Sequence, residues 1–167
     1  MRSRQLLPVL VMLVLVGVVA CGDEGNKSAE RAVAVVEATI RHVASEHPPA
    51  EGAEAGDLPV VYVVSVGEET LSAGIQAEVV SNLRDEIEVR FADAREEAID
   101  ETAPTAPVKD GGVLVVLGEI PKLGNPAVVP VEIYTARHEH IKMVYSFVPA
   151  GDVWNITSTS EVPLDAI

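Results

Sequence analysis

The segment Val60-Val61-Tyr62-Val63-Val64-Ser65-Val66 decides the fold of this chain. Its β-branched residues follow one another almost without interruption, whereas a strand with one wet face alternates apolar and polar residues. A run of this kind is typical of a strand that is covered on both faces. We therefore predict that residues 60–66 form the central strand of a sheet.

The residues on either side of this strand predict helices that cover the sheet. Before it, apolar residues recur at helical spacing from Ser28, an expected N-cap, to about His47. After it, a second helical period runs from about Leu71 to Glu86, and residues 87–91 then alternate as a half-buried strand. A strand, a helix and a strand in this order indicate a right-handed parallel crossover, so part of the sheet is expected to be parallel.

The second half of the chain is dominated by strand patterns. Residues 93–101 are rich in charge and predict a frayed helical turn, which runs into a surface loop over residues 102–107. The turn signal Asp110-Gly111-Gly112 introduces a buried strand at 113–117, and from residue 129 onward three segments with short connections predict an antiparallel meander. We therefore expect an α+β domain, in which two amphipathic helices pack on a mixed, mainly antiparallel sheet of about six strands.

The last predicted hairpin carries the sequence Gly151-Asp152-Val153-Trp154-Asn155-Ile156. This ending resembles the final hairpin of small domains that combine a helix with a curved sheet, including the nuclear-transport-factor-2-like group. The resemblance is confined to the C-terminal hairpins. The strand-helix-strand unit after the first helix departs from that group, so we carry over neither its pocket nor its ligands.

The N-terminus has the features of a secretory leader. The first four residues contain two arginines, and an apolar run follows from Leu6 to Ala20. As a helix this run would be about 22 Å long at 1.5 Å per residue, shorter than the hydrocarbon core of about 30 Å. A signal peptide over residues 1–20 is therefore favoured over a permanent spanning helix. Because positive residues stay cytoplasmic, the chain after Cys21 is expected to face outward.

The tetrapeptide Val18-Val19-Ala20-Cys21 closes this leader and resembles the lipobox of bacterial lipoproteins. The resemblance implies that Cys21 carries a diacylglyceryl thioether and becomes the acylated first residue of the mature chain, with palmitate among the expected acyl groups. Two or three acyl chains anchor a protein firmly, because each buried CH₂ contributes about 0.8 kcal/mol. The alternative is an ordinary signal peptide or an uncleaved anchor in which Cys21 is incidental.

The leader divides the chain into three expected parts. Residues 1–20 form the lipoprotein signal peptide, and residues 21–27 form the lipidated cysteine and a short polar tether. Residues 28–167 form a single extracytoplasmic domain, which needs neither a disulfide nor a metal at this length. We expect the protein in the bacterial cell membrane or outer membrane, held there by the lipid on Cys21.

The charge composition excludes one class of partner. The leader holds two of the 12 basic residues, so ten basic residues face 26 acidic ones in the mature chain, a net charge of −16. Such a surface repels nucleic acid and anionic lipid headgroups, and we therefore exclude DNA and RNA as partners. We interpret the acidic excess as serving solubility, with weak cation binding as an alternative. Cys21 is the only cysteine, so no disulfide can form within the chain.

Two histidines form the nearest approach to a metal motif. His138 and His140 flank Glu139, and in an extended segment the two imidazoles would share one face. A zinc site needs three or four ligands, and the neighbouring sequence supplies no others. We therefore interpret residues 137–140 as the wet tip of a hairpin and assign no metal ligand. An acidic stretch also lacks the ligand spacing of a calcium loop: Asp85, Glu86, Glu88, Asp93, Glu96 and Glu97.

Motifs for nucleophilic catalysis and for phosphate binding are absent from the sequence. It contains neither Gly-x-Ser-x-Gly nor Ser-x-x-Lys, and no glycine-rich loop opens a predicted helix. We assign no catalytic residue and no cofactor, and we expect a non-catalytic binding or interaction domain with an unknown protein or small-molecule partner. The alternative is a small envelope hydrolase built from dispersed Asp, Glu and His, which would need two such residues within hydrogen-bond reach in a cleft.

Overall fold

The computed structural model describes residues 23–49, 57–67, 70–151 and 153–163. The leader and Cys21 lie outside the described residues, as does Asp152 of the predicted last turn. Three helices are described: α1 (Asp23–Glu46), α2 (Ala73–Leu83) and the short α3 (Arg95–Ala98). The strands are β1 (Val60–Ser65), β2 (Glu88–Phe91), β3 (Val113–Leu117), β4 (Ala127–Ala136), β5 (Glu139–Ala150) and β6 (Val153–Val162).

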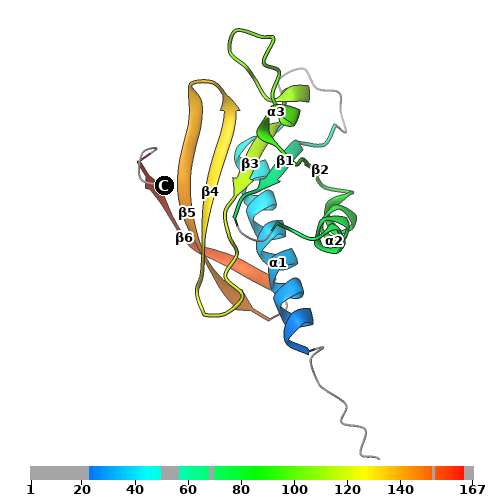
Figure 1. Ribbon diagram of the computed structural model, residues 1–167, viewed down its shortest axis with the longest axis vertical. Coiled ribbons are helices and arrows are strands. Elements are labelled where there is room, and N and C mark those ends of the chain that lie inside the picture. Colours follow the sequence, from blue (N-terminus) through cyan, green and yellow to red (C-terminus); the bar gives the residue numbers. More distant parts are fainter. Residues whose placement is uncertain (1–22, 50–56, 68–69, 152, 164–167) are drawn as a thin grey trace, which may run out of the picture.

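The six strands form one mixed sheet in the order β2-β1-β3-β4-β5-β6 (Figure 1). β1 pairs in parallel with β2 on one side and with β3 on the other, and α2 connects β1 to β2. The remaining neighbours, β3 to β6, pair antiparallel in chain order. The expected mixed sheet of six strands is therefore confirmed.

The position of β1 within the sheet corrects the prediction from its sequence. It lies second from the β2 edge, and β3 and β4 occupy the middle of the sheet. The run 60–66 indicated burial on both faces, which β1 has, but burial does not say how many strands lie on each side. A short outer strand, β2, is enough to make β1 an interior strand.

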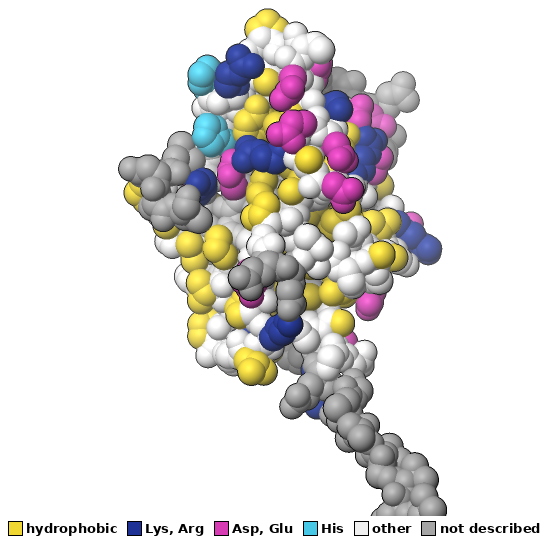
Figure 2. Space-filling view, in the orientation of Figure 1, with side chains coloured by type: hydrophobic (Ala, Val, Ile, Leu, Met, Phe, Trp, Pro, Cys, Tyr) yellow, Lys and Arg dark blue, Asp and Glu magenta, His cyan; other side chains and the backbone are white. Residues whose placement is uncertain are grey.

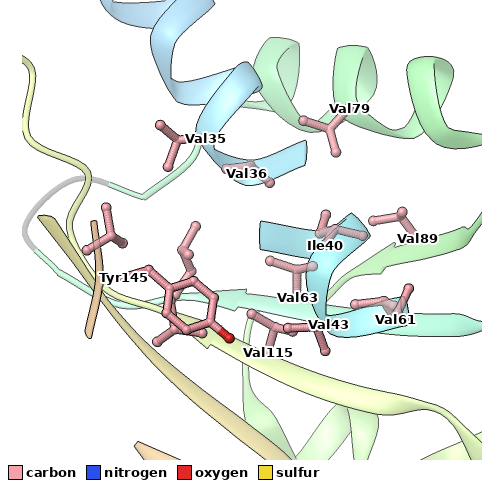
Figure 3. Close-up of a cluster of buried hydrophobic side chains, with 14 of the residues drawn as sticks. Val35, Val36, Ile40, Val43, Val61, Val63, Val79, Val89, Val115 and Tyr145 are labelled. Atoms are coloured by element: carbon pink, nitrogen blue, oxygen red, sulfur yellow. The ribbon is translucent and has the colours of Figure 1, made fainter. Parts of the chain in front are cut away.

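The main core lies between the two long helices and one face of the sheet (Figure 3). Valine and isoleucine side chains of α1 and α2 point down onto alternate residues of the strands. Each such side chain stabilises the fold by about 1.5–3 kcal/mol when fully buried. The labelled members are Val35, Val36, Ile40, Val43, Val61, Val63, Val79, Val89, Val115 and Tyr145.

A smaller core covers the opposite face of β1, β3 and the end of β4, where it includes Tyr134. Tyr62 and Leu114 pack there against Ala98 of α3 and Val108 of the loop that follows it. Beyond β4 the described residues leave side chains of the same face exposed, as at Val153 of β6, which is 57% exposed. The two cores explain why the sequence of β1 is apolar at consecutive positions and that of β6 is not.

The start of α1 differs from the prediction. The helix begins at Asp23, so Ser28 lies inside it and residues 23–27 are helical, where a tether was expected. Asn26 Nδ2 donates a 2.6 Å hydrogen bond to Glu30 Oε1, one turn further on, which stabilises these first turns. Among the described residues, no helix combines the length and the apolar composition that a membrane-spanning segment needs.

Two other boundaries shift for local reasons. The helix α2 starts after Ser72, whose Oγ accepts a hydrogen bond from the Ile75 N–H at 3.4 Å, and it ends at Leu83 instead of Glu86. β6 runs to Val162, well beyond the hairpin residues 151–156 quoted from the sequence, because its polar second half keeps pairing with β5 beyond a register shift. Backbone pairing therefore extends a strand whose side chains carry no apolar alternation.

Candidate binding groove

The outer face of α1 forms the floor of an open groove, which we call the α1 groove. Its volume is about 1230 Å³. Glu78 and Asn82 of α2 form one wall, and the other wall contains Leu123 of the β3–β4 loop and Trp154 of β6. Leu123 is 85% exposed, so an apolar side chain stands at the rim.

A side compartment of about 340 Å³ extends this groove between α1 and β6. It shares Ala34, Glu37 and Trp154 with the wider part, so the two are continuous. Ala34 and Ala38 lie one turn apart on α1, and their methyl groups keep the floor low. The β6 side of the compartment is lined by residues 153–156.

Arg31 holds the wall of the groove in place. Its guanidinium carbon lies 4.6 Å from the ring centroid of Trp154, a cation–π contact. Its Nη1 donates a 2.8 Å hydrogen bond to the carbonyl of Gly124, and its Nη2 donates a 3.4 Å bond to that of Leu123. Burial lowers the pKa of the Arg31 guanidinium, which nevertheless stays charged. One side chain thus joins α1, the β3–β4 loop and β6.

Glu37 joins the floor of the groove to α2. Its Oε1 accepts a 2.7 Å hydrogen bond from Asn82 Nδ2, and its Oε2 accepts a 3.1 Å bond from Arg41 Nη1. Arg41 Nε also donates to Glu86 Oε2 at 3.2 Å. These contacts hold α1 and α2 at a fixed spacing, so the side chains of Glu37, Arg41 and Asn82 stabilise the walls of the groove.

A smaller pocket of about 190 Å³ opens at the carboxyl ends of β1 and β3. Ser65 and Gly118 line it from the strands, and Ser28, the expected helix cap, lines it from α1. Ligands of sheets with parallel strands often bind at this end. The pocket shares Ser28 and Lys122 with the α1 groove, and we treat it as an annex of that groove.

A network of charged residues fastens β2 on the opposite face of the sheet. Arg90 donates to the Tyr62 hydroxyl at 2.6 Å, to Glu88 Oε1 at 2.6 Å and 2.9 Å, and to Asp110. The Tyr62 hydroxyl donates to Asp110 Oδ2 at 3.0 Å. Burial raises the pKa of Tyr62, and the hydrogen bond from Arg90 lowers the pKa of Asp110. Figure 2 shows acidic and basic side chains gathered in the upper half of the view, around α3.

The histidines considered in the sequence lie at the β4–β5 connection. His138 is exposed in the turn, and the His140 ring stacks at a tilt with its centroid 6.1 Å from that of Tyr134. Within the described ranges, no group of three or more His, Cys, Asp or Glu residues is arranged to hold a metal ion. The acidic stretch from Asp85 to Glu97 is divided among the turn after α2, the strand β2, the connection that follows β2, and α3.

No motif in the sequence identifies the groove. Trp154 is half-buried, with its ring packed against the main core and lining the groove wall. One signal was present: Ala34 and Ala38 repeat at helical spacing on the face of α1 opposite its apolar stripe. Small residues on the outer face of a helix leave space above it, but a groove forms only where neighbouring elements wall that space on both sides.

Comparison with protein-family models gives no match for this chain, and neither does comparison with curated proteins or with solved structures. Two features therefore bear on function: the sequence Val18-Val19-Ala20-Cys21, which resembles a lipobox, and the α1 groove. The two are close in the chain, since Cys21 precedes the first residue of α1 by two positions.

Proposed function

We propose that this protein is a lipid-anchored bacterial envelope protein whose extracytoplasmic domain binds a partner in the α1 groove without catalysing a reaction. The observation that carries the proposal is the sequence Val18-Val19-Ala20-Cys21 after a short apolar run with a basic start. Lipid on Cys21 accounts for a leader that is short for a spanning helix and for a single cysteine at its end.

The position of the groove supports an interaction at the envelope surface. Gly25, a lining residue of the groove, follows Cys21 by four positions, which amount to no more than about 14 Å of chain. Because α1 begins at Asp23, most of this distance is helical and shorter still. An anchored Cys21 therefore keeps one end of the groove close to the bilayer.

The chemistry of the groove supports binding over catalysis. Eight of its 14 lining residues are polar or charged and six are glycine or apolar, so the groove offers a partner both hydrogen-bonding groups and apolar contacts. Its central carboxylate, Glu37, is engaged by Asn82 and Arg41, and its cation Arg31 is stacked on Trp154. These groups define the shape of the groove and the orientation of a partner.

The anchor is tested by replacing the cysteine. In Cys21→Ser we expect loss of metabolic labelling with palmitate and either release of the domain from the membrane fraction or accumulation of the unprocessed precursor. Ser28→Ala serves as the control, since Ser28 lies beyond the proposed cleavage site and its variant should be labelled like the wild type. A Cys21→Ser protein that stays in the membrane fraction with unchanged labelling would contradict the proposal.

A further inference from the structure

The side compartment of the α1 groove runs along the edge of β6. Successive residues of a strand point to opposite faces of the sheet. Trp154 and Ile156 pack against the main core, whereas Val153 and Asn155 are exposed on the other face. All four residues line the compartment. Because these four consecutive residues face both sides of the sheet, one groove can contact all of them only if the groove runs along the backbone at the edge of the strand.

This edge has no strand neighbour in the part of the chain that the structure describes. β6 is the last strand in the sheet order, and β5 pairs with one side of it. The other side presents N–H and C=O groups that are free to pair with an added strand. α1 lies beside the first residues of β6, so the compartment is walled by a helix on one side and by a strand edge on the other.

The first residues of β6 leave this edge without the usual protection, and the bulge of the strand comes after them, where its register with β5 shifts opposite Ser146 and Phe147. Edge strands commonly carry charges, prolines or bulges that prevent the addition of another chain. Residues 153–160 contain neither a charged residue nor a proline, and their Thr, Ser, Val and Ile residues suit an extended conformation. The first charge of the strand is Glu161.

We propose that the partner is an extended peptide segment that adds to β6 as a seventh strand and lies in the α1 groove between β6 and α1. The proposal rests on the binding function proposed above and names the class of its partner. An extended polypeptide is the ligand that satisfies a row of backbone donors and acceptors. Neighbouring strands lie about 4.8 Å apart, so the added segment takes the place beside residues 153–156.

The floor of the compartment limits the size of the side chains that a bound segment can carry. Alternate residues of an added strand would face α1, where Ala34 and Ala38 present only methyl groups. Small apolar side chains fit there, and larger ones would meet the helix backbone. Glu37 and Arg41 border the same floor, so polar side chains of the segment find partners at the rim.

The test uses the full-length protein in detergent micelles and a display library of random decapeptides as the probe. We expect enrichment of peptides with small apolar residues at alternate positions. An enriched peptide is then synthesised with N-methyl groups on either its odd or its even residues, which removes alternate amide donors and keeps every side chain. Addition to β6 requires that one methylated form loses at least about tenfold in affinity and the other does not.

Two protein variants locate the binding site. Ala34→Trp fills the floor of the compartment and should weaken the peptide at least about tenfold. Ser45→Trp adds the same side chain to an exposed position of α1 outside the groove and should bind like the wild type. Circular dichroism of both variants verifies that the fold is kept. If Ala34→Trp is unstable, the affinities of the odd and even N-methylated peptides for the wild-type protein still test the proposal.

Three results would overturn the proposal. They are the absence of any enriched peptide, equal binding of both N-methylated forms and the parent peptide, and self-association of the protein through β6 that Ala34→Trp abolishes. The last result would assign the edge to a second copy of the chain. Failure of the anchor is separate, because Cys21→Ser removes the lipid and leaves the peptide affinity unchanged.

Discussion

The two edges of the sheet are built differently. β2 has four residues, of which Glu88 and Arg90 are charged, and Arg90 is hydrogen-bonded to Tyr62 and Asp110. β6 has ten residues with one charge, Glu161. A short and charged strand resists the addition of another chain, whereas a long and neutral one accepts it. The difference indicates which edge of the domain is available to a partner.

The largest expected effect comes from placing a negative charge on each edge strand, at a buried position of β2 and at an exposed position of β6. Val89 of β2 is 8% exposed within the main core, and Val153 of β6 is 57% exposed. We expect Val89→Asp to lower the free energy of unfolding by about 3 kcal/mol or more, because a carboxylate without a partner enters the core. Val153→Asp should change it by no more than about 0.5 kcal/mol. Urea titration followed by circular dichroism measures both, and equal losses would show that the two edges are not distinct.

An intermediate effect on the free energy of unfolding is expected at Trp154, where β6 packs against α1. Trp154→Ala removes a half-buried ring and its contact with Arg31, and we expect a loss of about 2–3 kcal/mol in the free energy of unfolding. Trp154→Phe keeps an aromatic face for the guanidinium and should lose about 1 kcal/mol or less. Equal destabilisation of the two variants would show that the aromatic contact with Arg31 does not stabilise the packing of β6 on α1.

The smallest effect concerns pH and the β2 edge. Arg90 lowers the pKa of Asp110 in the folded state below the value of about 3.9 expected in the unfolded chain. Such a group contributes stability that is present above about pH 4 and is lost as the pH falls through the folded pKa. The wild type should therefore exceed Asp110→Asn in stability at pH 7, and the difference should shrink below pH 4.

Urea titrations at pH 7, 4 and 3 measure this difference. Tyr62→Phe removes one donor to Asp110 and keeps Arg90, so it should show a smaller part of the same pH dependence. Hydrogen exchange should accelerate in acid at β2 before it does at β6, because only β2 is fastened by this network. A gap between wild type and Asp110→Asn that widens as the pH falls would contradict this assignment.

Much of the fold could be predicted from local patterns. The apolar run 60–66, the β-branched strand 113–117 and the helical periods on either side of β1 all appear where they were expected. These elements are visible in the sequence because the period of a helix or strand is repeated within a few residues. Their ends were less well predicted: the N-terminus of α1 and the C-terminus of β6 depend on hydrogen bonds with residues outside the pattern.

The groove could not be predicted in this way. Arg31, Gly124 and Trp154 come together from three elements that are far apart in the chain, and no short motif joins them. Ala34 and Ala38 of α1 form the floor of a groove only because α2 and β6 pack on either side of them. A site formed by tertiary packing leaves only weak signals in any one segment.

The sequence by itself determined which segments become helices and strands, and it contains the tetrapeptide ending at Cys21 whose resemblance to a lipobox motivates the proposed anchor. The tertiary structure decided that β1 lies off centre, that β6 ends the sheet and that α1 stands beside its open edge. The physical reason is the range of the interactions. Periodicity and capping act between neighbours in the chain, whereas strand order and a free edge arise from hydrogen bonds and contacts between residues that only the folded chain brings together.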